Sequence, residues 1–117
     1  MMKRLAAKAF RSLGLGGYGA EIRVRASDRF ILGYPKSGNT WLDFMIASLR
    51  VERVEEVTFA TINDLVGDIH AVWPPRILLR PSPRYLKSHA PYDPRISRAI
   101  YIARHPYAVA VSYYYYL

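Results

Sequence analysis

The chain has 117 residues, with 17 lysines and arginines against 9 aspartates and glutamates, and so a formal net charge of +8. It contains no cysteine, which excludes a disulfide framework and a thiolate metal site. No apolar run is long enough to span a bilayer, and basic residues interrupt the early apolar stretch, which excludes a typical secretory signal. We therefore expect a soluble, cytoplasmic protein of one small domain, or part of a larger one. Its charge suits an anionic ligand, a nucleic acid or an acidic membrane face.

Residues 1–26 are predicted to form a basic extension that precedes the domain. A short helix is expected first, because Leu5, Ala9 and Leu13 share one apolar face among lysines and arginines. The glycine-rich run at residues 14–19 then ends this helix and forms a flexible joint. A membrane-surface or partner-binding helix is one interpretation. A solvated extension is the other, and we favour it.

A strand, a glycine-rich turn and a helix are predicted in that order over residues 29–42. The strand is the apolar run at residues 30–32, and the helix follows from the spacing of its apolar residues, Leu42, Met45, Ile46 and Leu49. Unpaired backbone N–H groups and the helix dipole would create positive potential in the turn between them. The turn also carries the side chains and the flexible backbone that a phosphate-binding loop needs, from Lys36, Ser37, Gly38, Asn39 and Thr40.

The position of the lysine distinguishes this loop from that of the nucleoside triphosphatases. In their pattern, G-x-x-x-x-G-K-[ST], the lysine directly follows the second glycine and the hydroxyl holds magnesium. Gly33, Gly38 and Thr40 match this spacing, but Asn39 stands in the place of the lysine, which has moved to Lys36. A cation inside the turn suits a diphosphate-like bridge rather than a terminal phosphate. An ordinary strand-to-helix turn with a surface lysine remains the alternative.

The middle of the chain contains few residues to which chemistry can be assigned. A short helix is predicted at residues 61–67, with Thr61 as its cap. Asp64, Asp68 and His70 lack the spacing of a metal site, so we expect no bound metal. His70 and Trp73 are candidates for the wall of an acceptor pocket.

Tyr85, Lys87 and His89 alternate along a predicted strand at residues 84–89 and therefore lie on one of its faces. Near neutral pH, a neutral imidazole can take a proton from an alcohol, and a lysine beside it can stabilise developing negative charge. A lone histidine is more often structural than catalytic, so the residues by themselves leave both roles open.

A third strand is predicted at residues 98–104, and it is apolar enough to be buried in a parallel sheet. Pro106 is well placed to begin the helix that follows. Arg104 ends the strand and Ser112 lies two turns into the helix, so a forked cation and a hydroxyl meet at a second strand-to-helix junction. A βα unit with an ordinary surface arginine is the alternative.

Three segments, in the same order, resemble the cytosolic-type sulfotransferases, which use 3′-phosphoadenosine 5′-phosphosulfate (PAPS). YPKSGNTW (residues 34–41) is similar to the 5′-phosphosulfate loop of that family, and KSHAPY (residues 87–92) to its K-[TS]-H-x-P segment, whose histidine is the catalytic base. IYIARHPYAVAVSYY (residues 100–114) resembles R-[ND]-P-x-D-x-x-x-S-Y-Y, whose arginine and serine hold the 3′-phosphate. His105 and Ala108 depart from this last pattern. They are not the phosphate ligands, so we expect a local loss of stability rather than of recognition.

The resemblance implies an α/β fold with a P-loop-like parallel β-sheet flanked by helices, and a sulfotransferase domain that begins near residue 27. PAPS would lie across the carboxyl ends of the strands. The loop would hold its 5′-phosphate and sulfate, Trp41 would stack on the adenine, and Arg104 with Ser112 would bind the 3′-phosphate.

The same resemblance implies how the reaction is catalysed. His89 would take the proton of a hydroxyl or amine on a small-molecule acceptor. Lys36 would neutralise charge on the bridging oxygen and Lys87 would assist the other sulfuryl oxygens, with no metal required. Members of the family are considerably longer than this chain, so we expect a fragment or a truncated product. Its sheet edge and last helix would then need an oligomeric partner or a C-terminal segment.

Two other classes of protein remain open at this point. A kinase-like, P-loop nucleotide-binding protein is supported by the glycine spacing, but opposed by the position of Lys36 and the lack of a metal-binding carboxylate. A basic nucleic-acid-binding module is supported by the charge and the many tyrosines, but no recognised nucleic-acid motif is present.

Overall fold

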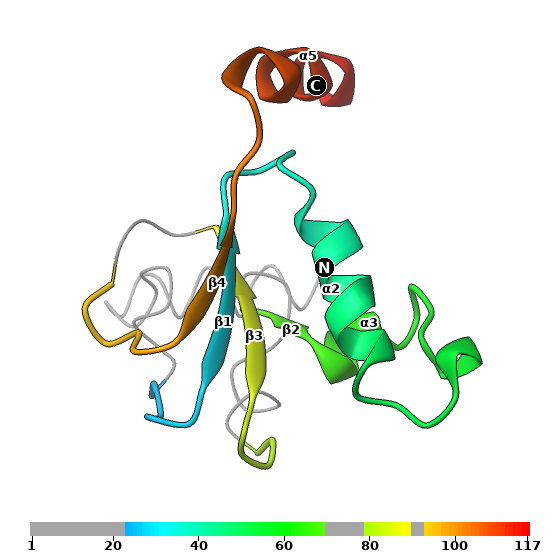
Figure 1. Cartoon of the computed structure of the whole chain (residues 1–117), viewed down its shortest axis with the longest axis vertical. Coiled ribbons are helices and arrows are strands. Elements are labelled where there is room, and N and C mark those ends of the chain that lie inside the picture. The colour runs from blue at the N-terminus through cyan, green and yellow to red at the C-terminus, as the bar shows by residue number, and fades with distance from the viewer. Residues whose placement is uncertain (1–22, 70–78, 90–92) are drawn as a thin grey trace, which may run out of the picture.

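The computed structural model describes residues 23–69, 79–89 and 93–117 (Figure 1). The predicted N-terminal helix and the glycine-rich joint therefore lie outside the described residues, as does most of the basic extension. The same is true of His70 and Trp73, the two candidates for the wall of an acceptor pocket.

The centre of the fold is a four-stranded sheet in the order β2-β3-β1-β4. Its strands are β1 (Arg29–Gly33), β2 (Gly67–Asp68), β3 (Tyr85–Ser88) and β4 (Ala99–Ile102). All three neighbouring pairs are parallel, so every strand carries its carboxyl end to the same edge of the sheet. The helices α2 (Asn39–Ser48) and α3 (Ile62–Leu65) lie together on one face (Figure 1). This arrangement confirms the predicted α/β class.

Alternation along β1 divides the core between the two faces of the sheet. Phe30 points to one face, where it packs with Leu86 of β3. Ile31 points to the other face, where it packs under the helices with Ile46, Ala47, Ile62 and Val66. A strand flanked by neighbours on both edges and covered on both faces reads as an unbroken apolar run, which is why β1 was predictable from its sequence.

The helix α2 was predicted correctly, but its buried face was only partly predicted. Ile46 is buried as expected, whereas Met45 and Leu49 are 45% and 87% exposed. The buried stripe instead runs through Asn39, Asp43, Ile46 and Ala47, which also follow helical spacing. The spacing of apolar residues alone could not predict this buried face, because two of its four residues are polar.

Between α2 and β2 the chain forms a short 3₁₀ helix (Val54–Glu56) and then α3. Thr61 does precede α3, but its side chain does not cap the helix. The Thr61 hydroxyl donates to the Glu56 carbonyl at 2.6 Å and accepts the Thr58 backbone N–H at 2.9 Å. The predicted cap is therefore wrong, because the preceding turn uses the hydroxyl instead.

The expectation of a buried third strand is wrong. Strand β4 pairs only with β1 among the described strands, and Ile100 and Tyr101 are 51% and 68% exposed. Helix α5 (Pro106–Tyr116), which begins at Pro106 as predicted, stands away from the sheet beyond its carboxyl edge (Figure 1). Because α5 does not cover β4, the apolar side chains of this strand are exposed, although its sequence is typical of a buried strand.

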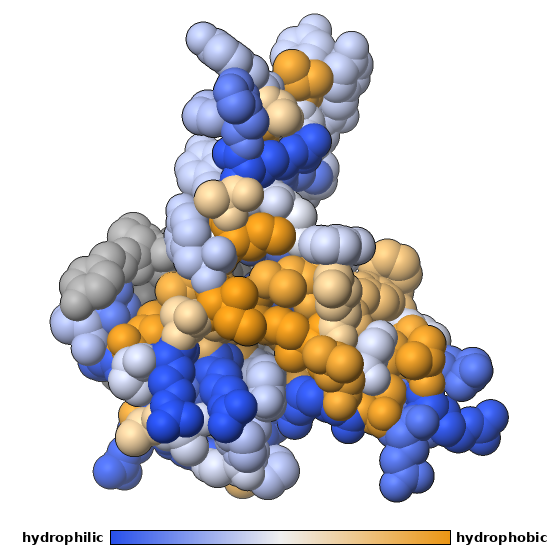
Figure 2. Space-filling model, viewed as in Figure 1, coloured by the Kyte–Doolittle hydropathy of each residue, from blue (hydrophilic) through white to orange (hydrophobic). Residues whose placement is uncertain are grey.

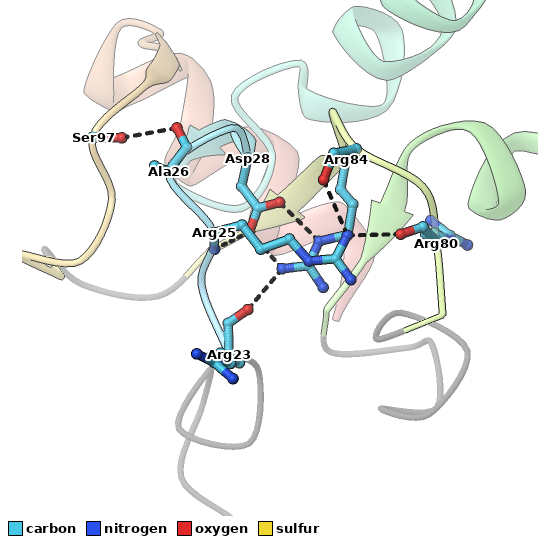
Figure 3. Close-up of polar contacts among 8 residues, drawn as sticks. Arg23, Arg25, Ala26, Asp28, Arg80, Arg84 and Ser97 are labelled. Carbon is cyan, nitrogen blue, oxygen red and sulfur yellow. Dashed lines mark hydrogen bonds and ion pairs between the residues drawn. The ribbon is translucent and has the colours of Figure 1, made fainter.

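A buried ion pair joins the opposite, amino-terminal ends of β1 and β3 (Figure 3). Asp28 immediately precedes β1 and Arg84 immediately precedes β3, and both side chains are fully buried. The Arg84 Nε and Nη2 atoms donate to the two Asp28 carboxylate oxygens at 2.8 and 2.5 Å. The backbone N–H of Arg25 also donates to Asp28, so the carboxylate is bound from two segments.

Candidate active site

Sheet topology brings the predicted loop and the predicted base together. In the parallel register, Leu32 of β1 lies opposite Ser88 of β3. One residue further along each strand are Gly33, where the loop begins, and His89. The Nδ1 atom of His89 lies 2.7 Å from the Gly33 carbonyl oxygen.

This contact fixes the tautomer of His89. A carbonyl oxygen can only accept a hydrogen bond, so Nδ1 must carry the hydrogen and donate it. In the neutral ring, the lone pair that can accept a proton is then on Nε2. A backbone atom of the loop thus orients the imidazole.

The loop between β1 and α2 is a tight turn closed by its own polar groups. The Ser37 N–H donates to the Tyr34 carbonyl at 3.2 Å, and the Asn39 amide Nδ2 donates to the same oxygen at 2.9 Å. Lys36 and Gly38 both have positive φ, of 66° and 104°. For glycine this conformation is unstrained, but for lysine it is uncommon and is a feature of strained functional turns.

The loop leads directly into the amino terminus of α2. Gly38 occupies the N-cap position, and no side chain caps the first N–H groups of the helix. The first turn also carries no acidic residue, so the positive end of the helix dipole faces the loop without a counter-charge from that turn. Thr40 and Trp41 follow in this turn, and both are exposed, Trp41 by 67%.

Gly33 is required by close packing where three elements meet. A β-carbon placed there would lie 2.5 Å from Asn39 Oδ1 and 2.7 Å from Ile102 Cγ2. The absence of a side chain therefore lets β1 approach both β4 and the start of α2. The glycine of the predicted motif serves the geometry of the loop as well as its flexibility.

Lys87 lies two residues before His89 on β3, and its ammonium contacts two carboxylates. Its Nζ atom is 3.5 Å from Asp43 Oδ2, on α2, and 3.8 Å from Asp68 Oδ2, on β2. Lys87 and Asp43 are largely buried, so little water screens their attraction. Burial raises the pKa of the Asp43 carboxyl above its usual range, although the Lys87 ammonium opposes this shift.

Arg104 reaches the loop from the segment between β4 and α5. Its Nη1 atom donates to the Lys36 carbonyl at 3.1 Å, which brings the third predicted motif against the first. The Lys36 ammonium lies over the Tyr116 ring, 3.4 Å from the ring centroid. Ser112 is half-buried in the middle of α5 and, unlike Arg104, does not line the cavity between loop and helix.

That cavity has a volume of about 380 Å³ and lies between the loop and the first turns of α5. Aromatic and small apolar side chains form most of its wall, and polar groups come from the loop and from Arg104. Its lining residues are Tyr34, Ser37, Tyr101, Ala103, Arg104, Pro106, Val109, Ala110 and Tyr113.

The family model of the sulfotransferase domain matches residues 26–117, which is most of the chain. The chain belongs to this family. Two of the three sulfotransferase-like segments, at residues 34–41 and 100–114, lie wholly within the described residues, and the third is described as far as His89. The loop, His89 and Arg104, which these segments supply, are brought together at the carboxyl edge of the sheet.

Several named sulfotransferases are similar to the chain. Mouse Sulfotransferase 4A1 is 31% identical over 105 residues, covering 81% of this chain and 37% of the relative. Rabbit amine sulfotransferase is 28% identical over 113 residues, with coverage of 82% and 35%. Mouse Sulfotransferase 1E1 is 31% identical over 113 residues, with coverage of 80% and 37%. The chain thus spans a little over one third of the relatives' length, and no solved structure matches it.

Sequence reasoning missed the groups that orient the residues of this candidate site. The Gly33 carbonyl could not be found, because a backbone contact between β1 and β3 needs the register. Asp43 left a signal, since an aspartate three and four residues before Ile46 and Ala47 lies on the buried face of a helix and requires a partner. Tyr116 gave no signal within its run of tyrosines.

Two general features of the sulfotransferase domain can be stated for the described part of the chain. Residues 23–69, 79–89 and 93–117 contain no cluster of three or more side chains suited to holding a metal ion. Within the same ranges, each helix is too short or too polar to cross a membrane.

Proposed function

We propose that the chain is the donor-binding part of a sulfotransferase that transfers a sulfuryl group from PAPS to a hydroxyl or amine on a small-molecule acceptor. The observation that best supports this is the 2.7 Å contact between His89 Nδ1 and the Gly33 carbonyl. It supports a histidine that donates from Nδ1 and, as a neutral ring, could take a proton on Nε2 beside the predicted phosphate-binding loop. Neither an ordinary structural loop nor a nucleotide-binding loop needs a base at that point.

The residues of the site fit the charge of PAPS. The uncapped start of α2 and the Lys36 ammonium suit its 5′-phosphosulfate, as the N–H groups and cation of a phosphate loop do. Arg104 is exposed beside the loop, and its forked donors suit the 3′-phosphate, with Ser112 as the second group that the family pattern implies. Trp41 is exposed on the first turn of α2, where an aromatic face is accessible for stacking on adenine.

When bound, PAPS supplies an activated sulfuryl group whose bond to the 5′-phosphate breaks as the acceptor attacks sulfur. His89 Nε2 takes the acceptor proton, and the Gly33 carbonyl keeps the ring in the orientation that this requires. Lys36 neutralises charge on the departing phosphate oxygen, after its ammonium leaves the Tyr116 ring. Lys87 lies two residues before His89 on the same strand face and adds positive charge to assist the other sulfuryl oxygens.

The proposal is tested by calorimetric titration of the folded chain with 3′-phosphoadenosine 5′-phosphate (PAP), with ADP and Mg·ATP as controls. We expect a clear preference for PAP over ADP, because only PAP carries the 3′-phosphate. Equal binding of PAP and ADP would contradict the proposed donor site. Tighter binding of Mg·ATP would instead favour the kinase-like class. A steep salt dependence for an oligonucleotide, absent for PAP, would favour the nucleic-acid module.

Arg104→Ala should abolish the preference for PAP over ADP. A hydrogen bond between charged groups contributes about 1.5–3 kcal/mol, so we expect PAP affinity to fall by roughly one to two orders of magnitude while ADP affinity stays unchanged. Arg95→Ala is the matched control, because Arg95 pairs with Asp93 in the segment before β4. A parallel loss of affinity for both nucleotides would contradict a role in reading the 3′-phosphate.

The acceptor class and the cytoplasmic location predicted from the sequence remain predictions. Rabbit amine sulfotransferase carries an amine acceptor in its name, which supports including amines among the acceptors to be screened. A phenol and an arylamine are suitable first probes, since each presents one of the two proposed nucleophiles.

A further inference from the structure

Asp43 is a carboxylate in a place where a carboxylate is unfavourable. Asp43 lies on the buried stripe of α2, beside Ile46 and Ala47, and is only 4% exposed. Its Oδ1 atom is buried and has no hydrogen-bond partner in the described part of the chain. Buried charges are normally paired and fully hydrogen-bonded, so the position calls for an explanation beyond stability.

The contact that Asp43 does make joins the loop helix to the strand of the proposed base. Its Oδ2 atom lies 3.5 Å from Lys87 Nζ. Lys87 lies on β3, two residues before His89 and on the same face. Asp68 of β2 approaches the same ammonium at 3.8 Å. Among the described residues, the ionisable groups that influence Asp43 are Lys87 on β3, His89 directly after β3, and Asp68 on β2.

Stability does not account for this arrangement. Burial is the largest influence on the pKa of Asp43 and raises it, and the attraction of Lys87 only partly opposes that effect. The charged carboxylate is therefore held at a net unfavourable position. Such groups are common where a charge is needed for function.

We propose that Asp43 is a positioning residue that anchors the Lys87 ammonium, so that its charge faces the sulfuryl group from one direction. Asp43 acts through Lys87 and does not touch the substrate. The second part of this inference, the direction toward the sulfuryl group, rests on the proposed function. The first part, the anchoring, does not.

The anchoring can be tested by NMR with lysines labelled at the ε-carbon. The chain has four lysines, Lys3, Lys8, Lys36 and Lys87, so the spectrum is simple, and loss of a signal in Lys87→Arg assigns the residue. A fixed ammonium makes the two ε-protons inequivalent, whereas a mobile one averages them. We expect two resolved ε-proton shifts for Lys87 in the wild type and in Asp43→Glu, and a single averaged shift in Asp43→Asn.

Asp93→Asn is the control, because Asp93 pairs with Arg95 away from the loop, and it should keep the two resolved shifts. Circular dichroism establishes that each variant is folded. Persistence of the two shifts in folded Asp43→Asn would overturn the anchoring. A single shift in the wild type would overturn it as well, since the ammonium would then be mobile despite Asp43.

The direction toward the sulfuryl group is tested by adding PAP and PAPS in turn. The two ligands differ only by that group, so we expect the Lys87 signal of the wild type to differ between them and the difference to vanish in Asp43→Asn. No difference in a wild type that binds PAP would overturn this part alone. Failure of PAP to bind would refute the proposed function and this part with it, while the anchoring would still be decided by the ε-proton shifts.

Discussion

The orientation of the His89 side chain, the proposed base, depends on a backbone atom. Its Nδ1–H donates to the carbonyl of Gly33, the residue at which the predicted phosphate loop leaves β1. The orientation of the ring is therefore coupled to the loop. A suitable substitution at residue 89 can keep the hydrogen bond to the Gly33 carbonyl while removing the basic ring nitrogen.

His89→Asn should abolish sulfuryl transfer while leaving PAP binding intact. The asparagine amide can still donate to a carbonyl but cannot take a proton near neutral pH, and loss of a general base lowers rates by about 10²–10⁴-fold. Transfer is measured with radiolabelled PAPS and a phenol acceptor, and PAP affinity by calorimetry. Full activity in His89→Asn would refute the assignment of the base.

Asp43 predicts a pH dependence of stability whose sign follows from its burial. Its pKa is raised in the folded protein above the ordinary value of 3.8, so the folded state binds this proton more tightly than the unfolded state does. Below pH 3.8 both states are protonated and the group has no net effect. As the pH rises above 3.8 and through the folded-state pKa, the buried carboxylate ionises and the folded protein loses stability.

Asp43→Asn removes this effect, so the variant should gain stability relative to the wild type as the pH rises from about 3 to 7. Urea unfolding at a series of pH values measures the difference, and Asp93→Asn is the contrasting variant. The pKa of Asp93 is lowered by Arg95, so its ionised form stabilises the protein and its loss should have the opposite sign. A difference that shrinks with rising pH for Asp43→Asn would contradict the prediction.

At the scale of residues, the sequence predicted that Lys36 and Gly38 lie in a turn between a strand and a helix, and the structure confirms this position. Their role in binding phosphate stays a prediction. Lys36 and Gly38 belong to a loop whose backbone conformation follows from its place between strand and helix, and both have the unusual φ that a tight turn needs. The partners of Lys87 were not predictable, because Asp43 and Asp68 are 44 and 19 residues away in sequence and meet it only through sheet order. Contacts of that kind depend on which strand neighbours which.

At the scale of elements, the Asp28–Arg84 pair fixes the amino-terminal ends of β1 and β3. Because the register of these two strands places His89 beside Gly33, the ion pair at one end of the sheet supports the site at the other. The pair also binds the preceding segment, since Arg84 Nη2 donates to the Arg23 carbonyl at 2.8 Å (Figure 3). Removal of one partner would leave the other charge buried.

Arg84→Met should therefore destabilise the protein by about 3–5 kcal/mol, measured by urea unfolding. The double variant Asp28→Asn/Arg84→Met should recover part of this loss, because no charge remains buried and the asparagine oxygen can still accept the Arg25 N–H. Arg95→Met, at an exposed pair, should change stability by less than about 1 kcal/mol. A double variant no more stable than Arg84→Met would show that the buried charge is not the cause.

The elements themselves were predictable in proportion to how much local sequence determines them. β1, β3, α2 and α5 begin and end within a few residues of their predicted bounds, since apolar runs, glycine and proline mark them. The exposure of β4 was not predictable, because its apolar residues, such as Ile100, fit a central strand and an uncovered edge strand equally well. Only the position of α5, away from the sheet, decides between the two.

At the scale of the whole molecule, no strand of residues 23–69, 79–89 and 93–117 pairs with the outer edge of β4. Ile100 and Tyr101 are exposed on this edge strand, and α2 adds Met45 and Leu49 to the exposed apolar surface. Figure 2 shows apolar side chains gathered across the body of the molecule between more polar regions above and below. An exposed edge strand with apolar side chains is a template for pairing with another chain.

We therefore expect the chain to self-associate as its concentration rises, and Ile100→Lys to reduce this association. A lysine on an edge strand opposes pairing because its charge would have to be buried between two sheets. Sedimentation velocity over a range of concentrations measures the effect, and PAP binding should not change, because Ile100 does not line the cavity at the loop.

Asn63→Lys is the matched control, since it adds the same charge at an exposed residue of α3, remote from the β4 edge. If self-repulsion from a higher net charge were the cause, Asn63→Lys would reduce association as much as Ile100→Lys does. If the open edge is the cause, only Ile100→Lys will do so. A wild type that sediments as a monomer at every concentration would show that this edge does not pair between chains.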